Sequence, residues 1–151
     1  MRKVFVAASI ALVASAAWAQ KKETGNGAFD ALDKNHDGFL RKEEVAGDRE
    51  LTKRFAKFDA DKNGRWNVDE FVKANQDNDR RVLADSAITA QVKALLLAEK
   101  GVPSTAISVE TYEGRVLLSG CVDGAAVKEK AGKVAAGVSG VKLVQNNLVV
   151  K

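Results

Sequence analysis

The sequence is poor in cysteine, proline and histidine, with one of each among its 151 residues. The single cysteine, Cys121, excludes an internal disulfide, so the fold must be held by its apolar core or by bound metal. We interpret Cys121 as an inert small residue, and an exposed thiol that links two copies is the alternative. The C-terminal half has no histidine, no zinc-ligand spacing, no phosphate loop and no serine nucleophile with a base. We therefore do not expect an enzyme.

Aromatic residues and charge are unevenly distributed, which divides the chain. Residues 20–79 contain 14 acidic and 12 basic side chains, whereas residues 80–151 contain 6 and 10. The second part lacks phenylalanine and is rich in valine, leucine and alanine, so stacking on nucleic-acid bases is not expected. The break predicts two modules after the leader. The phenylalanines beyond the leader are Phe29, Phe39, Phe55, Phe58 and Phe71.

The first 19 residues have the pattern of a secretory signal peptide. Arg2 and Lys3 precede an uncharged apolar run from Val4 to about Ala14, and Ala17-Trp18-Ala19 gives a small-x-small cleavage site. The run is shorter than the roughly 20 residues of a membrane-spanning helix, which disfavours an anchor. We expect export with cleavage near Ala19 and no lipid attachment. Nothing in the later sequence predicts a membrane span.

Two twelve-residue segments of the acidic half repeat one pattern of oxygen-bearing side chains. Residues 33–44, DKNHDGFLRKEE, and residues 59–70, DADKNGRWNVDE, both fit D-x-[DN]-x-[DN]-G-x5-E. Side-chain oxygens fall at positions 1, 3 and 5, a glycine permits the turn at position 6, and a glutamate closes position 12. One match alone is compatible with an acidic turn. The phased repeat predicts two EF-hand calcium loops.

We expect each loop to bind one Ca²⁺ ion through these side chains and the main-chain carbonyl of position 7. With three formal negative charges in each set, the affinities should be moderate, roughly 10⁻⁵ to 10⁻³ M. Position 9 is Arg41 in the first loop, which cannot ligate, and Asn67 in the second, so the second site should be tighter. His36 at position 4 should point outward. The predicted ligands are Asp33, Asn35, Asp37, Phe39 and Glu44, followed by Asp59, Asp61, Asn63, Arg65 and Glu70.

Apolar residues recur in phase around the two loops, as expected for helix-loop-helix pairs. Each loop follows a phenylalanine four residues upstream, and Val45 or Phe71 follows its closing glutamate. Leu40 and Trp66, at position 8, should meet in a short strand contact. Asp48 is a plausible N-cap, which leaves only a short helix after the first loop. A metal-stabilised fold is slightly favoured over calcium sensing.

The basic half predicts the order α-β-β-α-β. Residues 75–81, NQDNDRR, have no apolar periodicity and are interpreted as a polar linker. A helix capped by Asp85 or Ser86 should end at Gly101, before Pro103. Strands at 107–112 and 115–122 are joined by Glu113-Gly114, a second helix spans 123–136, and a last strand spans 141–150. This order suits two helices on one face of a three-stranded sheet.

The segments DSAITAQVKALLLAEKG, ISVETYEGRVLLSGCVD and VSGVKLVQNNLVVK resemble a BON domain, over about residues 82–151. The first half resembles small bacterial EF-hand domains, over about residues 28–74. The resemblance implies an α+β fold, an all-α EF-hand pair in residues 20–74 followed by the α-β-β-α-β module. BON domains occur in osmotically induced periplasmic proteins and are regarded as phospholipid-binding or envelope-associating modules without catalytic activity. No catalytic residue is carried over.

These features lead to a hypothesis of an exported, non-enzymatic calcium-binding protein of the periplasm, whose BON module associates with anionic phospholipid. The net positive module can approach anionic headgroups, at about 1 kcal/mol per basic residue near the surface. A basic patch of Lys128, Lys130, Lys133 and Lys142 is one candidate surface, and ordinary solubilising charge is the alternative. The alternative function is a calcium-stabilised module that binds an envelope protein and has no lipid role. No nucleic-acid partner is expected.

Overall fold

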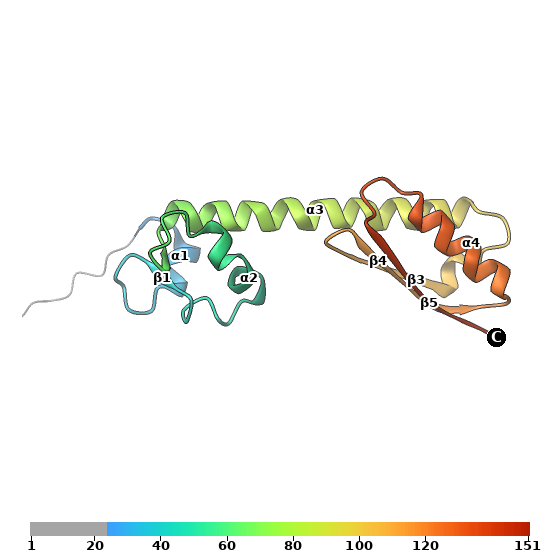
Figure 1. Ribbon diagram of the computed structural model, residues 1–151, viewed down its shortest axis with the longest axis horizontal. Helices are drawn as coiled ribbons and strands as arrows, with labels where there is room; N and C mark the ends of the chain where they lie inside the picture. The colour runs from blue at the N-terminus through green and yellow to red at the C-terminus, as the bar shows by residue number, and fades with distance from the viewer. Residues whose placement is uncertain (1–23) are drawn as a thin grey trace, which may run out of the picture.

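A computed structural model describes residues 24–151, so the predicted leader and its cleavage site lie outside the described residues. Two modules share one long helix, α3, which spans Val68–Ala98 (Figure 1). The N-terminal module contains α1 (Gly27–Leu32), β1 (Leu40–Arg41), α2 (Arg49–Phe58) and β2 (Arg65–Trp66). The C-terminal module contains η1 (Ser104–Ala106), β3 (Ile107–Tyr112), β4 (Arg115–Val122), α4 (Ala125–Ala136) and β5 (Leu143–Val150). The α+β class is as expected.

The N-terminal module is held by an aromatic core beneath the two loops. Trp66 is fully buried, stacks on Phe55 with ring centroids 4.7 Å apart, and donates its indole N–H to the Phe55 carbonyl at 3.0 Å. Leu40 pairs with Trp66 in the two-stranded ladder between β1 and β2, as position 8 of each loop predicts. The remaining buried core residues are Phe29, Val45, Leu51, Phe71 and Ala74.

The segment after the first loop differs from the sequence expectation. Residues 42–47 form turns rather than the short helix predicted there. Asp48 is the N-cap of α2, as expected, and accepts hydrogen bonds from the main-chain N–H groups of Glu50 and Leu51. Because Gly47 lowers helix propensity and Asp48 starts the next helix at once, no room remains for an exit helix.

The predicted linker, residues 75–81, is helical and lies in the middle of α3, and Asp85 does not cap a helix. α3 begins at a capping box, in which Asn67 and Glu70 satisfy each other's main-chain N–H groups. No glycine or proline interrupts its 31 residues. Polar contacts made by Asp77 and Arg81 take the place of the missing apolar periodicity. The helix ends before Gly101, whose φ of +79° few residues other than glycine adopt.

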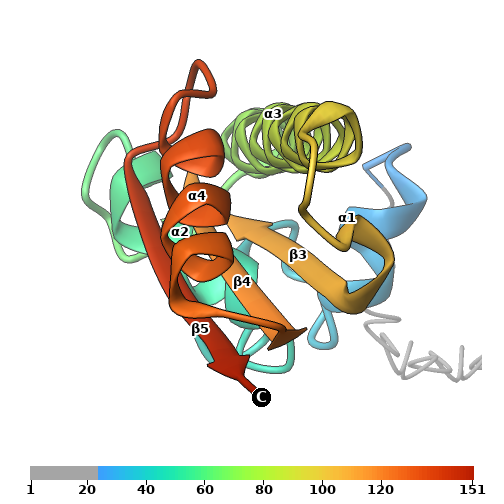
Figure 2. The same cartoon turned by 90° about the vertical axis from the view of Figure 1, so that its right-hand side faces the viewer.

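The C-terminal module is a three-stranded sheet with both helices on one face (Figure 2). β3 and β4 are antiparallel and β5 lies parallel to β4, in the order β3-β4-β5. The Glu113-Gly114 hairpin turn is confirmed, with φ values of +53° and +77° that fit the turn type of tight hairpins. α4 begins at Ala125 rather than at residue 123, and β5 begins at Leu143 rather than at residue 141.

The core of this module lies between the sheet and the C-terminal half of α3. Its buried residues come from α3, both hairpin strands, α4, the loop after α4, and β5. Gly120 has a packing role, because a Cβ there would lie 2.0 Å from the Ala106 carbonyl oxygen. Among the described residues, no helix combines the length and the apolar character that crossing a membrane requires.

Candidate metal centre

The first loop is folded by hydrogen bonds to its own predicted ligands. Asp33 is buried and accepts from the main-chain N–H groups of Asp37 and Gly38, at 3.2 and 2.9 Å. Glu44, at position 12, accepts from the N–H groups at positions 2 and 9, at 3.0 and 2.9 Å. These bonds hold the first and last carboxylates on the backbone of the loop.

The second loop repeats this scaffold. Asp59 accepts from the N–H groups of Asn63 and Gly64, at 3.1 and 2.9 Å. Glu70 accepts from Ala60 at position 2 and from Asn67 at position 9, both at 2.9 Å. The closing glutamate therefore belongs to the loop and to the first turn of α3 at the same time.

The backbone follows the same course at the tip of each loop. At position 4, His36 and Lys62 both have a φ of +56°, and at position 6, Gly38 and Gly64 have +82° and +77°. A left-handed conformation is unfavourable for a residue with a side chain, so its repetition indicates that the surrounding bonds impose it. His36 is exposed, in agreement with the outward direction expected for position 4.

The two loops differ in how their carboxylates converge. Ligand atoms of Asp59, Asp61 and Glu70 all lie within 4.8 Å of one another, the one such acidic group among residues 24–151. In the first loop, Asp37 instead pairs with Arg41 at 3.2 Å. Position 9, where a ligand or a water is expected, therefore carries a cation that already neutralises a predicted ligand.

The donor chemistry of the second loop fits a hard divalent cation. Its three converging groups are carboxylates, and oxygen is the donor that Ca²⁺ prefers. Glu70 is buried and Asp59 is partly buried, so bound charge would be shielded from water on one side. All five predicted ligands of this loop, the three acids as well as the Asn63 side chain and the Arg65 carbonyl, remain predictions. So do the five predicted for the first loop.

A polar network joins the N-terminal module to the sheet of the C-terminal module. The Tyr112 hydroxyl on β3 donates to Glu50 of α2 at 3.0 Å and accepts from Lys53, one turn further along α2. Arg81 of α3 lies 3.4 Å from Glu50, with its guanidinium 4.8 Å from the centre of the Tyr112 ring. The hydrogen bond from Arg54, followed by that from Tyr112, lowers the pKa of Glu50 to about 2, although burial opposes the shift.

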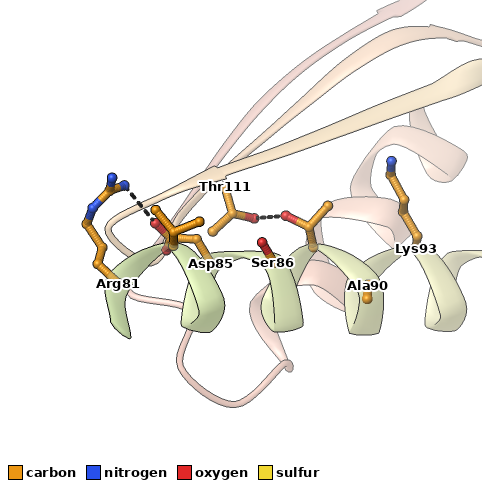
Figure 3. Close-up of a pocket in the computed structure, with 8 residues that line it drawn as sticks. Arg81, Asp85, Ser86, Ala90, Lys93 and Thr111 are labelled. Atoms are coloured by element: carbon orange, nitrogen blue, oxygen red, sulfur yellow. Dashed lines mark hydrogen bonds and ion pairs between the residues drawn. The ribbon is translucent and has the colours of Figure 1, made fainter. Parts of the chain in front are cut away.

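Asp85 anchors the hairpin to α3, a role that its sequence position did not suggest. It is buried and accepts hydrogen bonds from the main-chain N–H groups of Glu113 and Gly114, at 2.8 and 2.9 Å. Arg81 forms an ion pair with it at 3.3 Å. Figure 3 marks this pair with a dashed line. An acid in register with the buried residues Ile88 and Val92 was the one available signal. A solvated charge has no reason to occupy that face.

An open pocket of about 410 Å³ lies between α3 and β3 (Figure 3). Its polar groups largely satisfy one another, because Arg81 pairs with Asp85 and the hydroxyls of Thr89 and Thr111 are 2.7 Å apart. None of the predicted ligands lines it.

Comparison with known proteins finds a family match in each module. Residues 84–151 match the BON domain family. The C-terminal module is a BON domain. A stretch of 67 residues is 48% identical to osmotically-inducible protein Y of Escherichia coli (strain K12), and the match covers 44% of this chain and 33% of that protein. The chain thus spans about a third of the length of this relative.

An EF hand family matches residues 27–46, ahead of the BON domain. The match covers the first loop, whose carboxylates do not converge, whereas the converging carboxylates belong to the second. The prediction of a second EF-hand therefore depends on the repeated motif and on the scaffold of hydrogen bonds in residues 59–70.

Two of the four lysines considered as a basic patch from the sequence are paired with acids in the structure. Lys130 pairs with Glu99 and Lys133 pairs with Glu129, both at 2.6 Å, so half of that patch is neutralised. In the part of the chain that the structure describes, exposed Arg115 and Lys142 have no ion pair. Both lie next to the β3–β4 turn, since the Lys142 N–H donates to the carbonyl of Gly114.

Proposed function

We propose that the protein is an exported, non-enzymatic calcium-binding protein of the periplasm whose BON domain associates with anionic phospholipid. The observation that carries the proposal is the convergence of Asp59, Asp61 and Glu70 in a loop with EF-hand backbone bonding. The match to BON domains and the similarity to an osmotically inducible protein support an envelope location. The leader pattern in the sequence agrees with it.

Calcium would act first on the stability of the N-terminal module. Asp59 and Glu70 flank Trp66, which is in the centre of the aromatic core, so an ion held by both acids would tie α2 to α3 around that core. Without the ion, three carboxylates within 4.8 Å repel one another. We therefore expect calcium to raise the melting temperature and to lower the repulsion between this module and an anionic surface.

Isothermal titration of calcium into the exported protein tests the metal site. We expect a dissociation constant of roughly 10⁻⁵ to 10⁻³ M, accompanied by a change in the emission of buried Trp66. Magnesium, which requires a smaller and more regular shell, should bind more weakly and change the emission less. Protein that is stripped with a chelator, resupplied with calcium and then gives neither heat nor an emission change contradicts the proposal.

The lipid role is supported by the cations around the β3–β4 turn. Arg115 and Lys142, together with exposed Arg80 from α3, surround the end of the hairpin. Each can contribute about 1 kcal/mol of attraction near an anionic membrane.

A flotation experiment with vesicles of phosphatidylglycerol and phosphatidylcholine tests this role. Arg115→Ser with Lys142→Ser should reduce the bound fraction several-fold, whereas Lys133→Ser, a control in which the cation is already paired with Glu129, should reduce it little. If the protein binds the vesicles equally well with calcium and with chelator, calcium binding by the N-terminal module does not influence lipid binding by the BON domain.

A second candidate function, binding to an envelope protein without lipid, is favoured by the outer face of α3. Leu83 and Leu97 are 70% and 74% exposed there, more than a helix in contact with water alone requires. The same flotation experiment separates the two functions. Wild-type protein that remains in the bottom fraction at every vesicle composition contradicts the lipid role and leaves the protein partner as the candidate.

A further inference from the structure

We propose that Tyr112 of the BON domain is a positioning residue for the second calcium loop. It touches no predicted ligand, and it acts by fixing α2, the helix that leads into Asp59. This inference rests on the proposed binding of calcium at the second loop. It makes the BON domain part of the structure that holds the metal ligands in place.

The ligands of the second loop are carried by two helices that can move relative to each other. Asp59 directly follows α2, and Glu70 lies in the first turn of α3. The distance between the two carboxylates therefore depends on the angle between the helices. Changes in that angle are how calcium acts in sensor EF-hands.

The angle is fixed by contacts at two levels along α3. Near the loop, Asp77 binds Arg54 and Lys57 of α2, at 3.1 and 2.9 Å. Further along, Tyr112 holds the first turns of α2 through Glu50 and Lys53. The second level reaches α2 from the sheet, because Tyr112 is the last residue of β3.

Tyr112 is in turn held in place from α3. Its ring lies under the guanidinium of Arg81, and the turn that follows it is bound by Asp85. Both residues belong to the helix that carries Glu70. The path from one side of the metal cage to the other therefore runs from Glu70 along α3, through Asp85 and Tyr112, and back along α2 to Asp59.

The direction of the effect follows from the difference between the loops. The contacts of Asp77 and Tyr112 with α2 form a brace between the helices that flank the second loop, and the carboxylates of that loop converge. The first loop follows the six-residue α1 and is followed by turns, and its carboxylates do not converge. The braced arrangement is thus the one that favours the metal. By thermodynamic reciprocity, calcium in the second loop must strengthen the contact of Tyr112 with α2 by the same factor.

The test compares two variants of the brace with a matched control. Tyr112→Phe removes the hydroxyl and keeps the ring under Arg81, and Lys53→Met disrupts the same contact from α2. Thr111→Val is the control, because it removes a neighbouring hydroxyl that binds Thr89 of α3 and does not reach α2. Calcium affinity is measured from the emission of Trp66, and stability without calcium from thermal unfolding.

We expect Tyr112→Phe and Lys53→Met each to weaken calcium binding at the second loop about three- to tenfold. The double variant should bind calcium only slightly more weakly than Tyr112→Phe, because Tyr112→Phe already removes the hydrogen bond between Lys53 and Tyr112. Thr111→Val should lower the melting temperature and leave the affinity unchanged.

If the wild-type protein binds calcium and both brace variants bind it with the same affinity, the positioning role is overturned. The proposed calcium function then remains intact. An equal loss in Thr111→Val overturns it as well, because the effect would then follow general stability. Wild-type protein that binds no calcium at all overturns the inference together with the proposed function.

Discussion

The two loops of the N-terminal module have the same motif, the same formal charge on their predicted ligands and the same pattern of main-chain hydrogen bonds, yet their carboxylates converge only in the second. One difference is local, since position 9 carries Arg41 in the first loop and Asn67 in the second. A second is the flanking structure. The first loop lies between a six-residue helix and turns, whereas the second lies between α2 and α3. A third difference is the placement of the predicted acidic ligands, which stand at positions 1, 3 and 12 of the second loop and at positions 1, 5 and 12 of the first. A shared motif therefore does not by itself bring the carboxylates together.

The largest effect should come from Glu70→Gln, which separates the loops directly. The variant removes a bidentate anionic ligand, so calcium affinity at the second loop should fall at least about a hundredfold. Glutamine can still complete the capping box with Asn67, so the first turn of α3 should remain folded.

Glu44→Gln is the matched change in the first loop, and titration of both variants by calorimetry and by Trp66 emission checks the pair. Glu44→Gln should leave the emission change of Trp66 on calcium binding nearly intact. Equal losses of the emission change in the two variants would mean that the loops do not differ as ligand cages.

The next effect is expected from Asp85→Asn, which weakens the brace of the second loop from the BON side. The change removes a buried charge that binds two N–H groups and Arg81, so stability should fall by about 2–3 kcal/mol. Thermal unfolding with and without calcium measures it. The exposed Asp79→Asn, on the same helix, should cost under about 0.5 kcal/mol.

A smaller effect is expected from acid, through Glu50. Because Arg54 and Tyr112 lower the folded pKa of Glu50 from 4.5 to about 2, its contribution is present above pH 4.5 and is lost as the pH falls towards 2. The loss should be on the order of 2 kcal/mol, since the group is partly solvated. Melting temperatures measured in chelator between pH 6 and 2 test this loss. In Glu50→Gln, the melting temperature should fall less steeply with decreasing pH, because the contribution of Glu50 is absent.

The smallest effect should come from Arg41→Asn, which gives the first loop the position 9 residue of the second. The variant removes the guanidinium that pairs with Asp37 and introduces a side chain that can hold a water. Calcium affinity at the first loop should rise about threefold to tenfold, measured in a Glu70→Gln background. No change would show that the residue at position 9 does not separate the loops.

The parts of the structure that follow from local pattern were predictable. Both loops follow from a motif that repeats in phase, and the Leu40–Trp66 pair follows from position 8. The sheet follows from alternating apolar residues on either side of Glu113-Gly114, which is a strong turn signal. In each case the stabilising partners lie close in sequence or recur with a fixed period.

The parts that depend on contacts between distant residues were not predictable. Residues 75–81 have no apolar face, and they remain helical because Asp77 binds α2 and Arg81 binds both α2 and Asp85. Tyr112 and Glu50 are 62 positions apart, and no pattern in one sequence pairs them. Asp85 was predicted to cap a helix because an acid before an apolar run is the usual signal for a helix start.

The unbroken course of α3 has a consequence for geometry at a membrane. A helix of 31 residues rises about 1.5 Å per residue and is therefore roughly 46 Å long. Glu70 lies near one end of the helix and the BON sheet packs on its other half, so the helix fixes the distance between them. A bilayer held at the cations around the β3–β4 turn would contact the protein beside Asp85, which binds that turn about 15 residues, or roughly 22 Å, along α3 from Glu70. That separation exceeds the Debye length of about 8 Å, so the ion would sample the solution rather than the counterions of the headgroups.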